Sequence, residues 1–231
     1  MQYFREYLQK INIKNIAETM EKFVIYQDFL AEKNTVMNLT AIDKDEYFEK
    51  HFYDSLLLSE LHNFTSESLL DIGSGAGFPG LVLALVYPKL KVTLLEPTRK
   101  RANFLNETVK LLKLNNVTVV SERAEDYINE HREAFDLVTA RAVAHMSVLL
   151  ELAAPFVKVN GYLLAMKGQS AQEELEAAKH ALNVLNLTVV EQKKHQLITD
   201  KATRINFKII KTKRSNSKYP RNYGQIKKNP L

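Results

Sequence analysis

The chain has 231 residues, of which 45% are hydrophobic and 26% are charged, as is typical of a globular protein with one sizeable α/β core. Cysteine is absent, which excludes a disulfide framework and thiolate catalysis. No apolar run is long enough to span a bilayer, and the first residues lack the basic start and apolar core of a signal peptide. We therefore expect a cytoplasmic protein with no membrane association.

The net charge of +5 is concentrated at the C-terminus. Residues 208–231 contain eight lysines and arginines and no acid, whereas the other 207 residues contain 24 basic and 27 acidic residues, a net charge of −3. A basic tail indicates a polyanionic partner, with nucleic acid as the first expectation. A solvated terminus with no ligand is the alternative that composition leaves open.

The first 65 residues are expected to form a helical extension. Apolar residues such as Ile16, Met20 and Phe23 recur near helical spacing, and glycine and proline are both absent from this region. The pattern then changes at residues 68–72, a short apolar run that ends at a glycine cluster, as a buried parallel strand does.

Strands and helices alternate after this point. Further strands are predicted at 91–96, 117–120, 136–140 and 162–167, and helices at 79–86, 99–112, 147–156 and 171–185. Two strand-like runs follow, 187–197 and 204–210, separated by a polar turn too short for a crossover helix. We therefore expect these last two strands to pair antiparallel.

This element order predicts an α/β protein with a doubly wound, Rossmann-like sheet and an antiparallel C-terminal hairpin, which is the architecture of class I S-adenosylmethionine (SAM)-dependent methyltransferases. Three regions are expected: residues 1–65 as the helical extension, 66–211 as the SAM-binding core, and 212–231 as a basic tail.

A glycine turn follows the first strand. Gly73, Gly75 and Gly77 would let the backbone turn sharply and approach a ligand, next to the start of a helix that favours a carboxylate or phosphate. Residues 75–80 also match a dinucleotide fingerprint, so an NAD-dependent oxidoreductase is an alternative. Asp71, which gives the acidic-x-Gly-x-Gly-x-Gly form typical of methyltransferases, and the reversed hairpin both favour SAM.

Two later strand ends provide further candidate cofactor contacts. Glu96 ends the second strand, where an acid accepts hydrogen bonds from ribose hydroxyls, although an ordinary surface acid is the alternative. Ala124 and Glu125 follow the third strand and could meet the adenine ring, or simply form the first turn of a helix.

More selective motifs then identify a family. They are Asn38-Leu39-Thr40, His51-x-x-Asp54-Ser55-Leu56, Asp71 to Gly80, Lys100-Arg101-x-x-Phe104-Leu105, Arg123-Ala124-Glu125, Ala140-Arg141-Ala142, Lys167-Gly168 and Tyr219-Pro220-Arg221. The sequence resembles, over nearly its whole length, the bacterial 16S rRNA (guanine-N7) methyltransferase G family, also called glucose-inhibited division protein B. The resemblance implies methyl transfer from SAM to N7 of a guanosine in 16S rRNA. It also implies cofactor contacts at Gly73, Phe78, Ala124, Glu125 and Arg141.

The residues that the chain offers suit this acceptor. Methylation at C5 of a pyrimidine generally needs a cysteine nucleophile, and exocyclic amines commonly use an Asn/Asp-Pro-Pro-aromatic loop, where this chain has Thr139-Ala140-Arg141-Ala142. Guanine N7 already has a free lone pair, so positioning is the main requirement. Arg141, at the carboxyl end of a central strand, is the candidate catalytic residue. Whether it contacts cofactor, guanine or phosphate, or only pairs with Asp136 or Glu96, is left open, as are the roles of His51 and Asp54.

The tail supplies the candidate RNA contacts. They are Lys211, Lys213, Arg214, Lys218 and Arg221, interleaved with Tyr219 and Tyr223. Removing the residues after Ile210 is expected to weaken RNA binding and to leave cofactor affinity unchanged. We expect small-subunit rRNA or an assembling 30S subunit as partner, no metal, and a monomer. A non-catalytic RNA-binding protein of the same fold is the remaining alternative.

Overall fold

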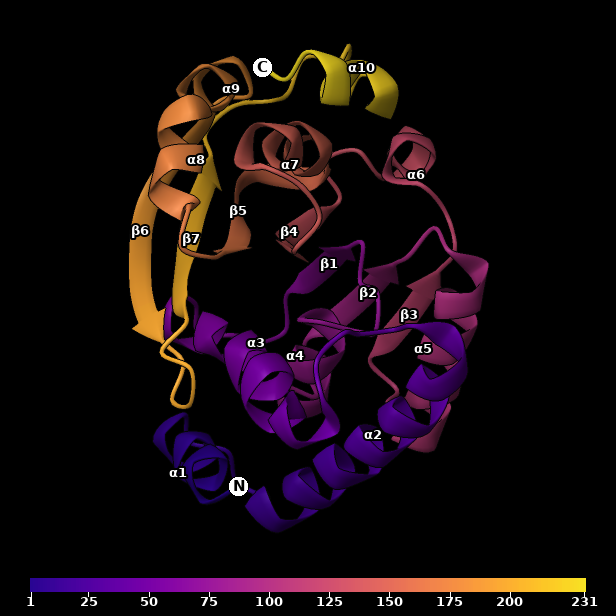
Figure 1. Ribbon diagram of the computed structural model, residues 1–231. Helices are drawn as coiled ribbons and strands as arrows, with labels where there is room; N and C mark the ends of the chain where they lie inside the picture. Colours follow the sequence, from indigo (N-terminus) through magenta and orange to yellow (C-terminus); the bar gives the residue numbers. More distant parts are fainter.

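The computed structural model describes all residues, Met1–Leu231, and centres on one seven-stranded sheet of order β3-β2-β1-β4-β5-β7-β6 (Figure 1). The strands are β1 (Ser68–Ile72), β2 (Lys91–Leu95), β3 (Val117–Val120), β4 (Phe135–Arg141), β5 (Val157–Lys167), β6 (Leu187–Gln196) and β7 (Thr203–Lys211). Strands β1 to β5 pair in parallel, whereas β7 is antiparallel to both β5 and β6. The predicted doubly wound sheet with a reversed hairpin is confirmed.

Helices cover both faces of the sheet. The helices are α1 (Gln2–Lys10), α2 (Ile16–Met37), α3 (Asp54–Leu56), α4 (Gly80–Val86), α5 (Arg99–Leu111), α6 (Ala124–His131), α7 (Met146–Ala153), α8 (Ala171–Ala177), α9 (Lys179–Val184) and α10 (Tyr223–Lys228). Figure 1 shows α1 to α5 below the parallel strands and α6, α7 and α10 above them. The helical extension of residues 1–65 therefore forms part of one layer and is not a separate body.

Alternate strand residues supply two cores, as expected of a sheet buried on both faces. Leu69 and Leu94 pack with the extension, where Phe4, Phe23 and Phe52 form an aromatic cluster. The neighbouring residues Leu70 and Leu95 point the other way and pack with α6 and α7.

Several predicted boundaries differ from the structure, and the largest difference is that β5 begins at Val157 and not at residue 162. Helix α4 begins at Gly80, with Pro79 as its N-cap, and the helix predicted for 171–185 is divided into α8 and α9 at the buried Ala178. Helix α7 ends at Ala153, and a 3₁₀ turn containing Pro155 follows. Proline has no backbone N–H and clashes with the preceding turn, which explains why the α-helix does not continue to residue 156.

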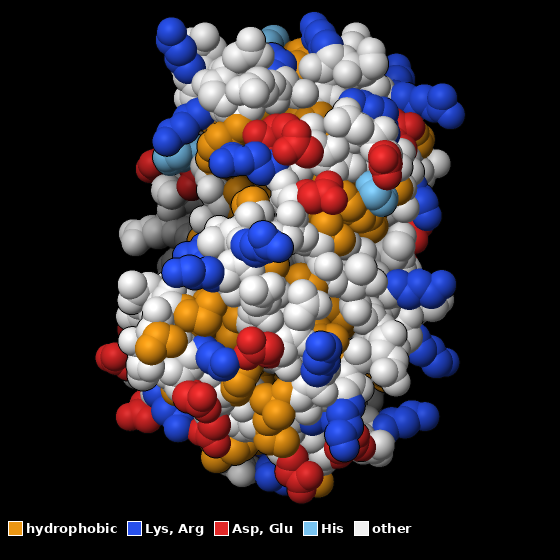
Figure 2. Space-filling model, turned by 90° about the vertical axis from the view of Figure 1, so that its right-hand side faces the viewer, with side chains coloured by type: hydrophobic (Ala, Val, Ile, Leu, Met, Phe, Trp, Pro, Cys, Tyr) orange, Lys and Arg blue, Asp and Glu red, His pale blue; other side chains and the backbone are white.

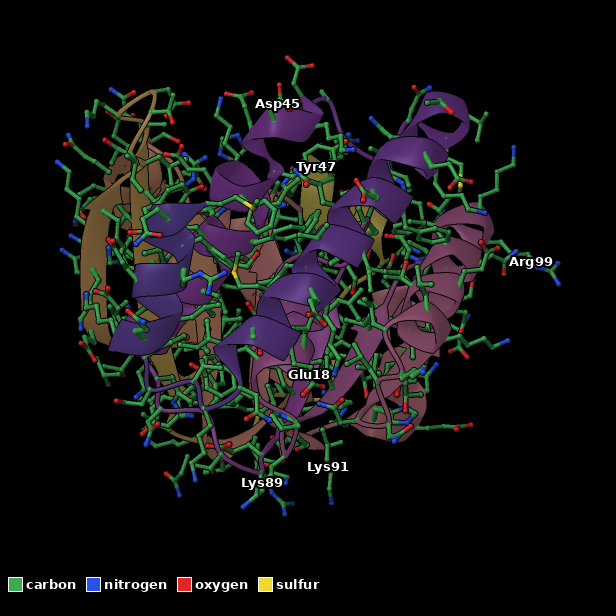
Figure 3. The ribbon with its side chains drawn as sticks, turned by 90° about the horizontal axis from the view of Figure 1, so that it is seen from below. Glu18, Asp45, Tyr47, Lys89, Lys91 and Arg99 are labelled. Carbon is green, nitrogen blue, oxygen red and sulfur yellow. The ribbon has the colours of Figure 1, made fainter.

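The parallel strands begin at one edge of the sheet and end at the other. Figure 3 shows Lys89 and Lys91, where β2 begins, projecting from one edge, and Asp45 and Tyr47 at the opposite edge. The order of the strands reverses between β1 and β4, and in open α/β sheets ligands bind at the carboxyl ends of strands beside such a point. The candidate site should therefore lie where β1 and β4 end.

Candidate functional site

The glycine turn after β1 needs glycine for a different reason at each position. Gly73, Gly75 and Gly77 all have positive φ values, of 67°, 58° and 101°, which L side chains rarely adopt. A Cβ at Gly77 would lie 2.5 Å from the hydroxyl of Tyr26 on α2, and one at Gly73 would lie 3.0 Å from Val143. A Cβ at Gly75 would face open space, with its nearest neighbour 3.9 Å away. Gly75 is thus the member of the trio at which an added Cβ would meet no steric clash.

Two buried carboxylates hold this turn. Asp71 accepts a hydrogen bond of 2.9 Å from the amide of Gly80, while its second oxygen has no partner, and burial raises the pKa of Asp71 to about 7. Glu96 accepts from the amides of Gly75 at 2.9 Å and Thr98 at 2.8 Å. Glu96 therefore stabilises the backbone conformation of the glycine turn. A carboxylate can accept more than two hydrogen bonds, so ribose binding by Glu96 stays a prediction.

A cavity of about 220 Å³ lies beside the turn, between the ends of β1, β2 and β3. Gly73, Ala124 and Glu125 line it, together with Leu95 and Pro97 from the end of β2. Three of the predicted cofactor contacts therefore share one cavity. The mixture of apolar walls, a carboxylate and a glycine turn fits a nucleoside linked to an amino acid, as in SAM. The side chain of Phe78 is buried and does not line this cavity.

A second and larger cavity, of about 570 Å³, lies at the carboxyl end of β4. Its walls are rich in charged and polar side chains, among them Lys50, His51, Asp54, Arg141, Lys167 and Arg204. Val143 lines both cavities, so the segment that follows β4 separates them. Sequence reasoning missed Arg204, because nothing in a strand pattern near the C-terminus connects it to residues 50–54.

Arg141 connects the sheet to the helical extension. Its guanidinium donates to the carbonyl of Lys50 at 2.9 Å, to Asp54 Oδ2 at 3.2 Å and to His51 Nδ1 at 3.0 Å. Its ion pair is with Asp54, and neither Asp136 nor Glu96 is its partner. Asp136, at the other end of β4, pairs instead with Lys158. The structure thus brings together Arg141, His51 and Asp54.

His51 is neutral in this network. It lies in a π-helical turn, Phe48–Tyr53, and burial beside the Arg141 cation lowers the pKa of His51 to about 3. Because Nδ1 accepts from Arg141, we assign the proton to Nε2, which lies 2.9 Å from the Thr40 hydroxyl. Phe78 completes the arrangement, since its ring stacks on His51 with centroids 4.3 Å apart and lies 4.8 Å from the Arg141 guanidinium carbon.

The C-terminal hairpin also reaches this site. Arg204 on β7 donates to Asp54 Oδ1 at 3.1 Å, so one buried carboxylate pairs with two arginines. Glu49 accepts hydrogen bonds from the amides of Ile198 and Thr199, which fixes the hairpin turn against the extension.

The basic tail divides into buried and exposed cations. Lys211 has no exposed side-chain surface, pairs with Glu133 at 2.9 Å and donates to two backbone carbonyls. This placement contradicts the prediction that Lys211 contacts RNA, because its ammonium group is already fully bonded inside the protein. Arg221 forms a bidentate pair with the buried Glu151, which is also a structural use.

Lys213, Arg214 and Lys218 are exposed, so contacts between these three side chains and RNA stay a prediction. The face of the molecule on the side of β3, α5 and α6 shows basic, acidic and apolar groups intermingled (Figure 2).

No helix has the combination of length and apolar character that crossing a bilayer requires.

Solved structures support the fold. A SAM-dependent methyltransferase from Aquifex aeolicus is 22% identical, with a TM-score of 0.55 over 73% of this chain and 94% of that one. The TYW2 protein of M. jannaschii, in complex with AdoMet, is 20% identical, with a TM-score of 0.53 over 63% of this chain and 69% of that one. These similarities establish the class I methyltransferase fold.

Sequence comparisons establish the family. Residues 19–205 match the family model described as rRNA small subunit methyltransferase G. A protein of Oceanobacillus iheyensis named ribosomal RNA small subunit methyltransferase G is 44% identical over 94% of this chain and 93% of its own. One of the same name from Fusobacterium nucleatum is 40% identical over 99% of both chains. These matches decide against the oxidoreductase interpretation, and the chain belongs to the rRNA small subunit methyltransferase G family.

Proposed function

We propose that this protein transfers the methyl group of SAM to N7 of a guanosine in 16S rRNA. The observation that carries the proposal is the pair of adjoining cavities at the carboxyl ends of the central strands. One is suited to the cofactor, and the other is large, polar and lined by cations, as an RNA base with its flanking phosphates requires. Their shared wall at Val143 lies where the methyl donor and acceptor would meet.

The chemistry needs orientation more than proton transfer. SAM supplies an electrophilic methyl group when bound, and guanine N7 presents a lone pair without losing a proton. Holding two reactants in line can lower a barrier by about 7–11 kcal/mol. His51, with a pKa of about 3, is neutral and a weak proton acceptor, which suits a reaction in which no proton has to be removed. Arg141, fixed by three hydrogen bonds, is the proposed residue that positions the acceptor.

The residues proposed to bind the cofactor, by direct contact or by shaping its site, are Gly73, Gly75, Gly77, Phe78, Glu96, Ala124, Glu125 and Arg141. Gly73, Ala124 and Glu125 act from the cavity wall. Gly75, Gly77 and Glu96 shape the turn, and the ring of Phe78 packs against the guanidinium of Arg141. RNA phosphates are met by the exposed cations Lys213, Arg214 and Lys218. We further propose that the enzyme acts as a cytoplasmic monomer on rRNA or on an assembling 30S subunit.

The test is a methylation assay with radiolabelled SAM and small-subunit RNA, either naked or in 30S particles. The labelled RNA is then reduced with borohydride and treated with aniline, which cleaves the chain at N7-methylguanosine and leaves other methylated bases intact. We expect cleavage at one guanosine. Labelled RNA that is not cleaved by this treatment would contradict the proposal. So would the absence of label from every RNA species.

The variant Arg141→Gln tests the role of Arg141, since it shortens the side chain and removes its charge. We expect loss of methyl transfer, whereas Lys158→Gln, at an exposed ion pair on β5, should leave it unchanged.

A further inference from the structure

The C-terminal segment, residues 212–231, is fixed to the body of the protein. Arg221 binds Glu151 on α7 through two hydrogen bonds of 2.7 and 2.6 Å, and Arg132 donates to the carbonyl of Tyr219 at 2.8 Å. The side chains of Tyr219 and Ile226 are buried. These contacts hold α10 in one position above α7 (Figure 1).

That position places Tyr223, the first residue of α10, at the cofactor cavity. Tyr223 lines the 220 Å³ cavity together with Ala124, Glu125 and Leu152, and is only partly buried. It contributes an aromatic side chain to a wall that otherwise comes from the ends of the parallel strands and from α6 and α7. No other residue after Leu152 lines this cavity.

We infer that Tyr223 is a cofactor-binding residue, and that the C-terminal segment forms the outer wall over the adenosine end of SAM. The assignment rests on the cavity geometry and on SAM as the cofactor, and it does not depend on which RNA base accepts the methyl group. It reverses the expectation that residues after Ile210 are dispensable for cofactor binding. An aromatic ring in this wall suits a purine, because the π-face of any base stacks on aromatic side chains.

Calorimetric titration of the full-length protein with SAM tests the assignment. We expect Tyr223→Ala to raise the Kd of SAM at least about five-fold, the lower limit for loss of one base–aromatic stack. Tyr223→Phe, which keeps the ring, should bind within two-fold of the original. Tyr223→Ala should weaken the binding of methylthioadenosine, which lacks the amino-acid end of SAM, by the same factor as the binding of SAM. Lys227→Ala, on the exposed side of α10, is the control.

A second variant guards against a folding defect. The chain contains no tryptophan, so Tyr223→Trp introduces a single fluorophore at the cavity, and Tyr162→Trp on β5 introduces one outside it. SAM should change the emission of the first protein and not of the second. Unchanged emission from Tyr223→Trp at saturating SAM, or a Kd within two-fold for folded Tyr223→Ala, would overturn the assignment. Either result would leave the methylation of guanine N7 to be judged by its own assay.

Discussion

Arg141 at the end of β4 donates a 3.2 Å hydrogen bond to Asp54, which belongs to the helical extension 87 residues earlier in the chain. The other oxygen of Asp54 accepts from Arg204 on β7 at 3.1 Å. One carboxylate with 3% side-chain exposure therefore joins the extension, the parallel sheet and the C-terminal hairpin at the wall of the larger cavity. The extension is thus a component of the candidate site as well as a cover for the sheet.

Asp54→Ala should consequently be strongly destabilising. It leaves two arginines without their buried counter-charge, and removing one partner of a buried ion pair typically costs about 3–5 kcal/mol. Urea denaturation measures the change in the free energy of unfolding. Lys179→Ala, which breaks an exposed pair with Glu176, is the control and should cost at most about 1 kcal/mol. Equal effects for the two variants would show that Asp54 does not have this linking role.

The fold was predictable because its signals are local. Apolar runs that end at glycine predict strands such as β1. The turn between β6 and β7 is so short that these two strands can pair only antiparallel. Gly73, Ala124 and Glu125 could be assigned to one cavity because parallel strands end at a common edge.

The partners of Arg141 were not predictable, since ion pairs between distant segments leave no trace in local periodicity. The role of Lys211 was misjudged for a related reason. The sequence shows that Lys211 carries a charge, but it does not show that the ammonium group points into the protein, where it pairs with Glu133. In the sequence, Tyr223 is only an aromatic residue among basic ones, because its place at the cofactor cavity depends on how the whole tail folds back.

Lys211 and Lys213 should therefore respond in opposite ways to substitution by methionine. Lys211→Met removes the ammonium that donates to the carbonyls of Ala154 and Val157, at about 1–3 kcal/mol for each buried group, and it removes the ion pair with Glu133. We expect a lower Tm and unchanged RNA affinity of the folded protein. Lys213→Met should keep the Tm and reduce the slope of log affinity against log salt by about 1. A salt slope that changes with Lys211→Met would restore Lys211 as an RNA contact.

Alanine substitutions at Gly75 and Gly77 should separate ligand binding from packing. The new Cβ of Gly77→Ala would overlap the hydroxyl of Tyr26 and lie 2.9 Å from Leu81, so we expect a loss of about 2–5 kcal/mol in unfolding free energy. Gly75→Ala meets only the cost of its left-handed backbone, about 1–2 kcal/mol. The affinity for SAM, measured by calorimetry, should fall for Gly75→Ala. Normal SAM binding by this variant would place the ligand elsewhere.

His51 and Asp71 should contribute opposite pH dependences to stability. The pKa of His51 falls from 6.5 to about 3 on folding, so the unfolded chain binds the extra proton between these values and stability rises with pH there. The pKa of Asp71 rises from 3.8 to about 7, so the folded chain retains a proton that the unfolded chain has lost, and stability falls as pH rises. Between about pH 4 and 6.5 the two contributions cancel.

Single substitutions should expose each contribution. Relative to the unsubstituted protein, His51→Gln should become less stable as the pH rises from 4 to 6.5, and Asp71→Asn more stable, each by up to about 1.4 kcal/mol per pH unit. Urea denaturation at half-unit pH steps measures both slopes, and other titrating groups drop out because they are common to the three proteins. Parallel curves for all three would show that neither burial nor the Arg141 cation perturbs these groups, and would remove the basis for a neutral His51 beside the acceptor.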